Sequence, residues 1–328
     1  MRKLVFLALF SATSTFATAQ TVRFVKTDGT GDGSSWAQAS NDLQLMINQS
    51  APFDEVWVAS GQYCPIRPAN DLNTIDSLNP NNAFVLQPDI KIYGGFPDTA
   101  NDTHNAPMSP LSQSSLSLEQ ARNTRNWGIH PTTLRGISGY FWSYHIVIAA
   151  GAVGGATLDG FTITFGIAFP LNSPSSNSSI TVNQQDIYNY FGGGIYLSQS
   201  APLLVNLKIE YNFAQEGAGI YMKQATPTII NTLICHNDSE NGGGGINCSQ
   251  YSTPTIINTT ITRNSSQSDY GHGMLNVSSH PKIYNTIIYG NENIGNPLGK
   301  DVDNFMQSSP QYRYSLVKGE TKTTIPIS

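Results

Sequence analysis

Few side chains in this 328-residue sequence have the types and spacing that catalysis requires. A histidine stands between two glycines in Gly271-His-Gly273, Arg263 precedes Asp269, and Asp301 lies two residues before Asp303. Elimination on an acidic sugar needs a strong base, Arg or Lys, beside carboxylates that hold a cation. Inverting glycoside hydrolysis needs two carboxylates about 6.5–9.5 Å apart. Neither Arg263 with Asp269 nor Asp301 with Asp303 is distinctive enough to assign a catalytic residue.

The three cysteines, Cys64, Cys235 and Cys248, are an odd number, so at least one thiol has no partner within the chain. Cys235 and Cys248 fall within one repeat, but spacing alone does not place their β-carbons within bridging distance. We expect buried structural thiols and leave their redox state open. Because no paired ligand spacing occurs, the sequence predicts no metal ligand and no cofactor.

The C-terminal half repeats one pattern four times. The copies open at Pro202-Leu-Leu-Val-Asn206, Pro227-Thr-Ile-Ile-Asn231, Pro254-Thr-Ile-Ile-Asn258 and Pro281-Lys-Ile-Tyr-Asn285. Their prolines are 25, 27 and 27 residues apart. A fixed period of this length is typical of a solenoid, in which each coil buries its apolar face against its neighbours.

Apolar residues recur at two positions of this repeat. One column holds Leu204, Ile229, Ile256 and Ile283, and the other holds Ile209, Ile234, Ile261 and Ile288. The runs around them are short, β-branched and bounded by Pro, Asn and Gly, which predicts strands. We expect about three strands per coil, stacked in parallel at roughly 4.8 Å, and roughly nine or ten coils. The repeated isoleucines then form the core.

Asparagines and glycines recur in step with the apolar columns. A second asparagine follows the first by six residues in every copy, at Asn212, Asn237, Asn264 and Asn291. Stacked amides at a corner can bond to one another, so a structural ladder is favoured over a row that binds ligand. Glycine steps such as Gly192-Gly-Gly-Ile195 predict positive φ or close approach of coils. They match neither a phosphate loop nor a calcium-binding nonapeptide.

Composition and the N-terminus limit the function classes. Charged residues are 12% of the chain and the net charge is −5, without Lys/Arg clusters, which argues against a nucleic-acid partner. A basic start at Met1-Arg-Lys3, an apolar stretch and Ala17-Thr-Ala19 predict a secretory signal peptide over 1–19. We expect no membrane span, because no segment is long and apolar enough.

The N-terminal part is less regular. Trp36, Leu43, Met46 and Ile47 can share one face of a helix that starts near Asp42, the best helix candidate in the chain, and we expect it to cover the open end of the stack. Three polar stretches interrupt the coils, at about 64–82, 97–126 and 170–190. The third carries a cluster of Asp186, Tyr188, Tyr190 and Phe191, for which packing on the solenoid flank is favoured over stacking on sugar rings.

Residues 20 to about 319 resemble the right-handed parallel β-helix proteins secreted by Bacteroidetes. The matching residues are Phe24-Val-Lys26, Gly33-Ser-Ser-Trp36, Asn41-Asp-Leu43, Val56-Trp-Val-Ala59, Gly61-x-Tyr63, Tyr93-Gly-Gly-Phe96, Leu158-Asp-Gly-Phe-Thr-Ile163 and Tyr314-Ser-Leu-Val317. The Gly-Gly-x-Ile and Asn-x5-Asn steps are similar to repeats of chlamydial polymorphic outer-membrane proteins. The resemblance implies the fold and export, but this fold hosts lyases, hydrolases and adhesins alike.

The resemblance also bears on catalysis. In β-helix pectin hydrolases a Gly-His-Gly accompanies an Asn-x-Asp, an Asp-Asp pair and an Arg-Ile-Lys, and none of these partners occurs here. His272 occupies the repeat position that Ala218 fills in another coil, which indicates drift of the repeat. Relatives often end in a sorting domain for type IX secretion. Residues 321–328 do not resemble one, which leaves open another export route or a truncated C-terminus.

Together these observations predict an all-β, right-handed parallel β-helix with about 25–27 residues per coil and an N-terminal capping helix. After the signal peptide we expect a single domain over 20–328: a cap at 20–60, irregular coils at 61–190, regular repeats at 191–292 and incomplete coils at 293–328. The expected function is non-catalytic adhesion or interaction in the extracellular space or at the cell surface, with a polysaccharide or cell-surface glycan as ligand. The alternative is a polysaccharide lyase or glycoside hydrolase. The oligomeric state is left open.

Overall fold

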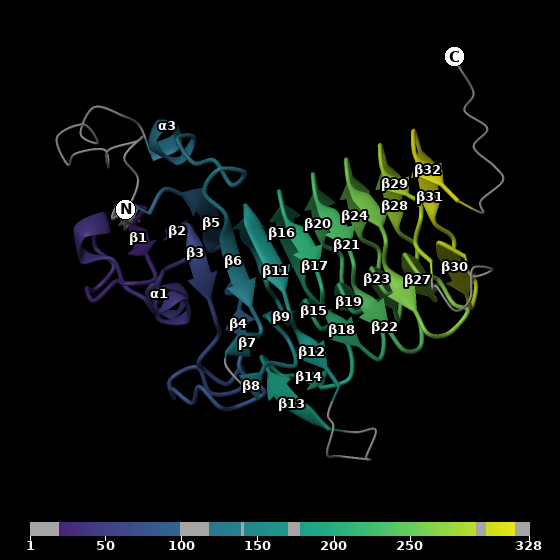
Figure 1. The fold of residues 1–328 in the computed structure, drawn as a ribbon, viewed down its shortest axis with the longest axis horizontal. Coiled ribbons are helices and arrows are strands. Elements are labelled where there is room, and N and C mark those ends of the chain that lie inside the picture. Colours follow the sequence, from purple (N-terminus) through teal and green to yellow (C-terminus); the bar gives the residue numbers. More distant parts are fainter. Residues whose placement is uncertain (1–19, 99–117, 139–140, 170–177, 293–299, 319–328) are drawn as a thin grey trace, which may run out of the picture.

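A computed structural model describes residues 20–98, 118–138, 141–169, 178–292 and 300–318. The expected signal peptide at 1–19 lies outside these residues. The described chain winds as successive coils along one long axis, and its strands stack into extended parallel sheets (Figure 1). Within the described residues no helix has the length and apolarity needed to cross a membrane. The arrangement is the predicted solenoid.

Three long parallel sheets form the sides of the solenoid. The longest, which we call the first sheet, has nine strands: β1 (Val22–Val25), β2 (Glu55–Ala59), β5 (Lys91–Phe96), β10 (Gly154–Asp159), β16 (Ala201–Val205), β20 (Thr228–Ile230), β24 (Thr255–Ile257), β28 (Lys282–Tyr284) and β31 (Gln311–Arg313). The second sheet has eight: β3 (Gly61–Tyr63), β6 (Thr132–Arg135), β11 (Phe161–Thr164), β17 (Lys208–Glu210), β21 (Leu233–Cys235), β25 (Thr260–Thr262), β29 (Ile287–Ile288) and β32 (Leu316–Val317). The third has seven: β4 (Phe84–Val85), β9 (Val147–Ala150), β15 (Ile195–Ser198), β19 (Ile220–Lys223), β23 (Ile246–Ser249), β27 (Met274–Val277) and β30 (Val302–Phe305).

Shorter elements complete the described fold. A fourth parallel sheet consists of β12 (Ile167–Ala168), β18 (Phe213–Ala214), β22 (Asp238–Ser239) and β26 (Ser265–Ser266). The regular coils therefore have four strands each, whereas the sequence predicted about three. Two antiparallel pairs lie outside the parallel sheets: β7 (Ile137–Ser138) with β8 (Phe141–Trp142), and β13 (Ser179–Val182) with β14 (Gln185–Tyr188). The helices are η1 (Trp36–Gln38), α1 (Leu43–Gln49) and α3 (Leu118–Arg122).

The two predicted apolar columns line up in register. In the first sheet Ile229 pairs with Leu204 on one side and Ile256 on the other, and Ile256 pairs in turn with Ile283. In the second sheet Ile209, Ile234, Ile261 and Ile288 pair in the same way. Both columns are fully buried in one continuous apolar core, because the side-chain alternation of each strand points these residues inward. Because each coil of a solenoid contacts only its neighbours, burial of these two columns between coils stabilises the stack.

The corners of the coils depend on residues that tolerate left-handed backbone. Asn206, Asn231, Asn258 and Asn285 have φ values of 52°, 51°, 50° and 48°. Asparagine adopts this conformation more readily than most other non-glycine residues. This explains why an asparagine follows each of the strands β16, β20, β24 and β28. A glycine is required at Gly219 for a different reason, since a β-carbon there would lie 2.4 Å from the carbonyl oxygen of Gly245 in the next coil. Gly192, with φ 71°, has the other role predicted for the glycines, so positive φ and close approach both occur.

The N-terminal end of the stack is covered by α1, as Figure 1 shows beside β1 and β2. Asp42 is the N-cap: its Oδ1 accepts a hydrogen bond from the Leu45 N–H over 2.9 Å. Leu43, Met46 and Ile47 are buried in the main core. The expected helical position of Trp36 was wrong, because Trp36 belongs to the separate turn η1 and packs on Phe24.

A second helix, α3, lies within the stretch expected to be a loop at 97–126, of which 99–117 are outside the described residues. Its Ala121 is buried with Tyr93 and Phe96, and Arg122 pairs with Glu55 over 2.5 Å. These tertiary contacts stabilise five residues whose sequence alone does not indicate a helix. The strand expected over 144–148 also begins later, at Val147.

Candidate functional site

The residues that the sequence singled out for catalysis serve mainly as structural supports. His272 is fully buried, and its Nδ1 accepts a hydrogen bond from the Ser266 N–H over 3.0 Å. Burial lowers the pKa of His272, so the imidazole is held neutral inside the coil. The Asp301 carboxylate, also buried, accepts the Asn291 N–H over 2.7 Å, and Asp303 accepts the Gly271 N–H over 3.0 Å. Each of these three side chains therefore holds a turn through one hydrogen bond, while His272 Nε2 and Asp301 Oδ2 are buried without a partner among the described residues.

Arg263 and Asp269 come from different parts of their coil. Arg263 follows β25 at a corner with φ 54° and is exposed on the outside of the second sheet. Asp269 lies further along, in the bend before β27, where its charge opposes the lowering of the His272 pKa. Arg263 therefore lies on the surface of the second sheet, whereas the charge of Asp269 acts on the buried His272.

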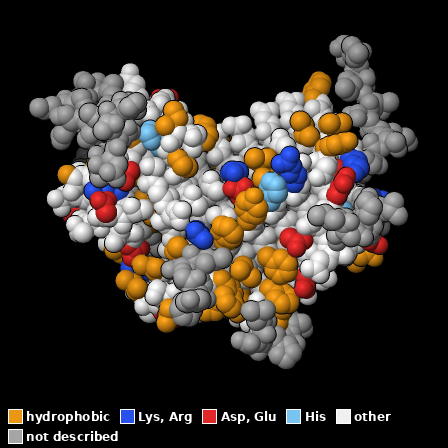
Figure 2. Space-filling model, in the orientation of Figure 1, with side chains coloured by type: hydrophobic (Ala, Val, Ile, Leu, Met, Phe, Trp, Pro, Cys, Tyr) orange, Lys and Arg blue, Asp and Glu red, His pale blue; other side chains and the backbone are white. Residues whose placement is uncertain are grey.

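Charged and polar side chains gather on the outer face of the second sheet. Adjacent strands β6, β11, β17, β21 and β25 place one outward row in register: Arg135, Thr164, Glu210, Cys235 and Thr262. We call this surface, together with the corner residues that follow each strand, the flank face. Figure 2 shows basic, acidic and histidine side chains close together over β17 and β21. Period-two alternation points this row outward, since Leu134 or an isoleucine stands before each of its residues and points into the core. Thr164 and Cys235 are nevertheless buried by their neighbours.

Planar side chains stack along the edge of the flank face. Arg135 lies over the Phe165 ring with 4.9 Å between the guanidinium carbon and the ring centroid. The Phe165 and Tyr211 centroids are 6.0 Å apart, and those of Tyr211 and His236 are 5.2 Å apart, with interplanar angles of 14° and 16°. All three rings belong to corner residues with positive φ, one coil apart. The rings cover one another's faces, so a ligand meets their edges.

The electrostatics of the flank face centre on Glu210. Lys208 Nζ forms an ion pair with Glu210 Oε1 over 2.8 Å, and the hydrogen bond that it donates there raises the pKa of Lys208. The other oxygen of Glu210, Oε2, lies 4.0 Å from Cys235 Sγ. Burial raises the pKa of the Cys235 thiol, and the Glu210 charge raises it further, while Lys208 and Arg263 act in the opposite direction. Lys208 pairs directly with Glu210, while Arg135 and Arg263 lie two coils away on opposite sides of it along the same face.

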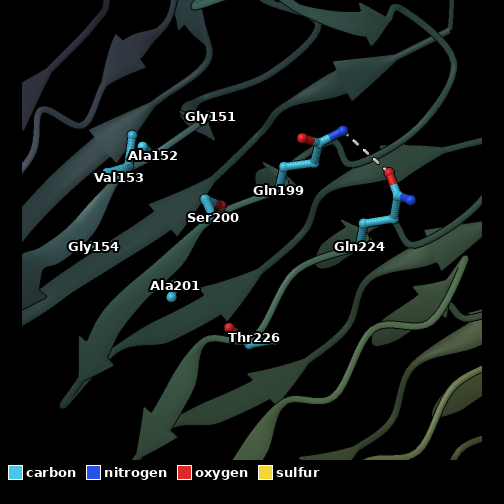
Figure 3. Close-up of a pocket in the computed structure, with 9 residues that line it drawn as sticks. All are labelled: Gly151, Ala152, Val153, Gly154, Gln199, Ser200, Ala201, Gln224 and Thr226. Atoms are coloured by element: carbon cyan, nitrogen blue, oxygen red, sulfur yellow. Dashed lines mark hydrogen bonds between the residues drawn. The ribbon is translucent and has the colours of Figure 1, made fainter.

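A groove also opens at the corner between the third and first sheets. It has a volume of about 670 Å³ and is lined by Gly151, Ala152, Val153, Gly154, Gln199, Ser200, Ala201, Gln224 and Thr226. Gln199 and Gln224 point out from successive coils, and the Gln199 amide donates to Gln224 Oε1 over 3.2 Å (Figure 3). None of the nine lining residues is ionisable, so the groove offers hydrogen bonds without acid–base groups.

The aromatic cluster of the third polar stretch packs on the solenoid. Phe191 stacks on Tyr221 with centroids 4.8 Å apart, and Tyr190 is buried. Ile187 of β14 is fully buried against the third sheet, in the same cluster as Tyr196. Packing on the solenoid, the favoured alternative, therefore holds for Tyr190 and Phe191, whereas Asp186 of the same cluster is exposed.

The sequence did not reveal that Glu210, Cys235 and His236 meet. One ligand-type atom from each lies within 4.8 Å of the other two. Glu210 and Cys235 are partners in the ladder between β17 and β21, and His236 is the next corner residue. The signal was present in the repeat, because residues 25 apart in this region occupy equivalent positions of neighbouring coils.

These features define the class of protein: the chain is an all-β, right-handed parallel β-helix. Residues 171–309 match the family model of the right handed beta helix region. A search of curated proteins found no match. Among solved structures, pectin methylesterase PemA from Erwinia chrysanthemi is 11% identical with a TM-score of 0.33, covering 90% of each chain. A pectin methylesterase in complex with hexasaccharide VII is also 11% identical, with a TM-score of 0.33, covering 93% of this chain and 92% of the other.

Proposed function

We propose that the protein is an exported, non-catalytic β-solenoid that binds an acidic polysaccharide through the flank face. The observation that carries this proposal is that Arg135, Lys208 and Arg263 share the flank face with Glu210, on a chain whose net charge is negative. A local excess of positive charge attracts carboxylate or sulfate groups of a sugar polymer. Arg135 and Arg263 provide forked donors suited to such groups.

The regular spacing of the coils supports a polymeric ligand. Adjacent strands lie about 4.8 Å apart, so donors repeat along the face at roughly the spacing of one sugar unit in an extended chain. Half-buried threonines of β6, β11 and β25 add hydroxyl groups along the outward rows: Thr133, Thr162, Thr260 and Thr262. A flat row of charged and hydroxyl groups suits surface binding more than enclosure of a reacting bond.

The chemistry of the described flank face favours binding over turnover. Glycoside hydrolysis with inversion requires a second carboxylate about 6.5–9.5 Å from the first. Between β6 and β25 the described outward row contains Glu210 as its acidic residue, and Lys208 holds one of its oxygens. Export rests on the predicted signal peptide at 1–19 and on the resemblance to secreted β-helix proteins. N-terminal sequencing of exported protein should then begin at Gln20.

Binding to a panel of uronic-acid, sulfated and neutral polysaccharides tests the proposal. We expect acidic polymers to bind, and the affinity to fall with added salt because exposed charges are screened. The double change Lys208→Ala with Arg263→Ala should weaken binding at least about 10-fold, since each lost charged hydrogen bond is worth 1.5–3 kcal/mol. Lys282→Ala, an exposed lysine of β28 on the first sheet, is the matched control.

Two results would overturn this assignment. Equal affinity of the double variant and the Lys282→Ala control would remove the flank face from the binding surface. Release of unsaturated products from a uronic-acid polymer would replace the binding role with the lyase alternative, and new reducing ends without unsaturation would support a hydrolase.

A further inference from the structure

The grouping of Glu210, Cys235 and His236 goes beyond binding of a sugar polymer. Their ligand atoms lie within 4.8 Å of one another, and Cys235 Sγ is 4.0 Å from Glu210 Oε2. In a tetrahedral zinc site, with bonds of about 2.0 Å to oxygen or nitrogen and 2.3 Å to sulfur, neighbouring ligand atoms are about 3.5 Å apart. Small side-chain rotations therefore bring all three atoms to vertices of such a tetrahedron.

A second observation comes from the imidazole of His236. Its Nδ1 is inaccessible to solvent and has no hydrogen-bond partner among the described residues. A buried, unpaired ring nitrogen costs free energy, and a bound cation relieves that cost by accepting its lone pair. The backbone of His236 is fixed by its corner conformation, φ 56°, and its ring is held by stacking on Tyr211. The histidine is therefore positioned in advance of any ligand.

The two oxygens of Glu210 have separate environments. Lys208 Nζ holds Oε1 over 2.8 Å, whereas Oε2 faces the Cys235 sulfur. An outer partner on one oxygen orients a carboxylate so that the other can bind metal. The positive charges of Lys208 and Arg263 oppose a cation here, so affinity should be lower than in a closed structural zinc site.

A catalytic thiol is a poorer explanation of the same residues. Reactive cysteines have a lowered pKa beside a cationic imidazole or a helix N-terminus. Here burial and the Glu210 carboxylate raise the pKa of Cys235. A carboxylate directly beside a thiol disfavours the free thiolate but favours a divalent cation that both groups share.

We propose that Glu210, Cys235 and His236 bind Zn²⁺ through three protein ligands, leaving a fourth position open at the flank face. On binding, the Cys235 thiol loses its proton to solvent and the sulfur forms the metal bond. The ligand set of one sulfur, one nitrogen and one oxygen suits Zn²⁺ better than Ca²⁺ or Mg²⁺, which prefer oxygen. The proposed site does not depend on whether the protein binds a polysaccharide.

Titration of the purified full chain with Zn²⁺ by calorimetry, and with Co²⁺ by absorption, tests the site. We expect one equivalent of Zn²⁺ to bind, and Co²⁺ to give a sulfur-to-metal charge-transfer band. Cys235→Ser, His236→Asn and Glu210→Gln should each raise the dissociation constant at least about 10-fold and reduce or abolish that band. Asn keeps the corner conformation at position 236, so this variant remains informative if Cys235→Ser does not fold.

The matched controls are Cys64→Ser, which removes a partly buried thiol elsewhere, and His280→Asn, which removes an exposed imidazole. Both should bind Zn²⁺ as the unchanged protein does. The proposal is overturned if the unchanged protein binds no Zn²⁺ under these conditions. It is equally overturned if His236→Asn binds with unchanged affinity, or if the charge-transfer band persists in Cys235→Ser and disappears in Cys64→Ser.

Discussion

The side-chain amide of Asn237 donates to Asn264 Oδ1 over 2.9 Å, and the same contact recurs in the neighbouring coils. Asn212 donates to Asn237 over 2.9 Å, and Asn264 donates to Asn291 over 2.9 Å. After Asn291, the Asp301 carboxylate takes the place of the next amide by accepting the Asn291 N–H. The inner asparagines thus form a continuous hydrogen-bonded row, which lets polar groups lie in the interior without unsatisfied donors.

Asn237→Ala should lower the free energy of unfolding by about 3 kcal/mol, because it leaves several buried groups without partners. Asn237 Oδ1 accepts both the backbone N–H and the side chain of Asn212, and its amide donates to the Ile209 carbonyl. Chemical denaturation measures the change. Asn231→Gly is the control, since Asn231 is exposed at a corner and Gly keeps its positive φ; we expect a loss under about 1 kcal/mol. Similar losses for both variants would contradict a stabilising role for the inner row.

Truncation of a buried isoleucine in the apolar columns should lower stability more than truncation of an exposed one. Ile256 is fully buried between Ile229 and Ile283, so Ile256→Ala should cost about 2–5 kcal/mol through lost burial and a residual cavity. Ile287 lies on a strand of the same solenoid but is 45% exposed, and Ile287→Ala should cost under about 1 kcal/mol. Midpoints of guanidinium unfolding, compared at constant slope, provide the measurement. Equal shifts would mean that the columns are not the source of stability.

The N-terminal cap depends on a buried ion pair. Arg67 donates through Nε and Nη2 to Asp42 Oδ2, over 3.0 and 2.6 Å, and its Nη1 donates to the Leu72 and Asn73 carbonyls. Asp42→Ala removes the helix cap and leaves a buried guanidinium unpaired, so stability should fall by about 3–5 kcal/mol.

The exposed pair of Lys26 with Asp28 is the control for Asp42→Ala. Its atoms are 3.4 Å apart and the Asp28 side chain is 60% exposed, so Asp28→Ala should change stability by under about 1 kcal/mol. Thermal unfolding of both variants, with limited proteolysis near residue 72, measures the effect. A protease-resistant Asp42→Ala variant with unchanged melting temperature would show that the cap does not need this pair.

The sequence predicted the features that repeat and missed those that depend on a single tertiary contact. Ile229, Ile256 and Ile283 revealed their stacking because an unchanged side chain recurred at a near-constant spacing. The strands β18, β22 and β26 were missed, since each has only two residues and the Ala or Ser at its end is a weak strand former. The helix α3 is formed through contacts with distant residues, which no local pattern encodes.

In the candidate site, too, the residue types were visible in the sequence, whereas their positions in space were not. Arg263 was singled out by type, yet its surface position followed only from the corner geometry after β25. Glu210, Cys235 and His236 are ordinary residues when each is considered alone. Their proximity arises from stacking of coils, and could have been inferred only by aligning Glu210 and Cys235 at the same repeat position. Tyr211 likewise stacks on His236 because both occupy the corner position of their coils.

A buried histidine should make stability depend on pH. The His145 imidazole is 1% exposed, and its Nδ1 lies 2.9 Å from the Gly192 carbonyl oxygen, which can only accept, so Nδ1–H is the donor. Nε2 is buried without a hydrogen-bond partner among the described residues. Burial lowers the pKa of His145 from 6.5 to about 4, with the carbonyl contact opposing part of that shift. The folded protein therefore holds this imidazole neutral at pH values where the unfolded chain protonates it.

The sign of the effect follows from proton binding. Between pH 6.5 and about 4 the unfolded chain binds a proton that the folded chain does not, so the free energy of unfolding falls as the pH is lowered. A shift of this size corresponds to about 3 kcal/mol. Denaturation at pH 7, 6, 5 and 4 should show a steeper loss for the unchanged protein than for His145→Phe, which lacks the titrating ring. His280→Asn removes an exposed imidazole and should keep the steep slope. Parallel slopes for the unchanged protein and His145→Phe would show that His145 is protonated equally in both states.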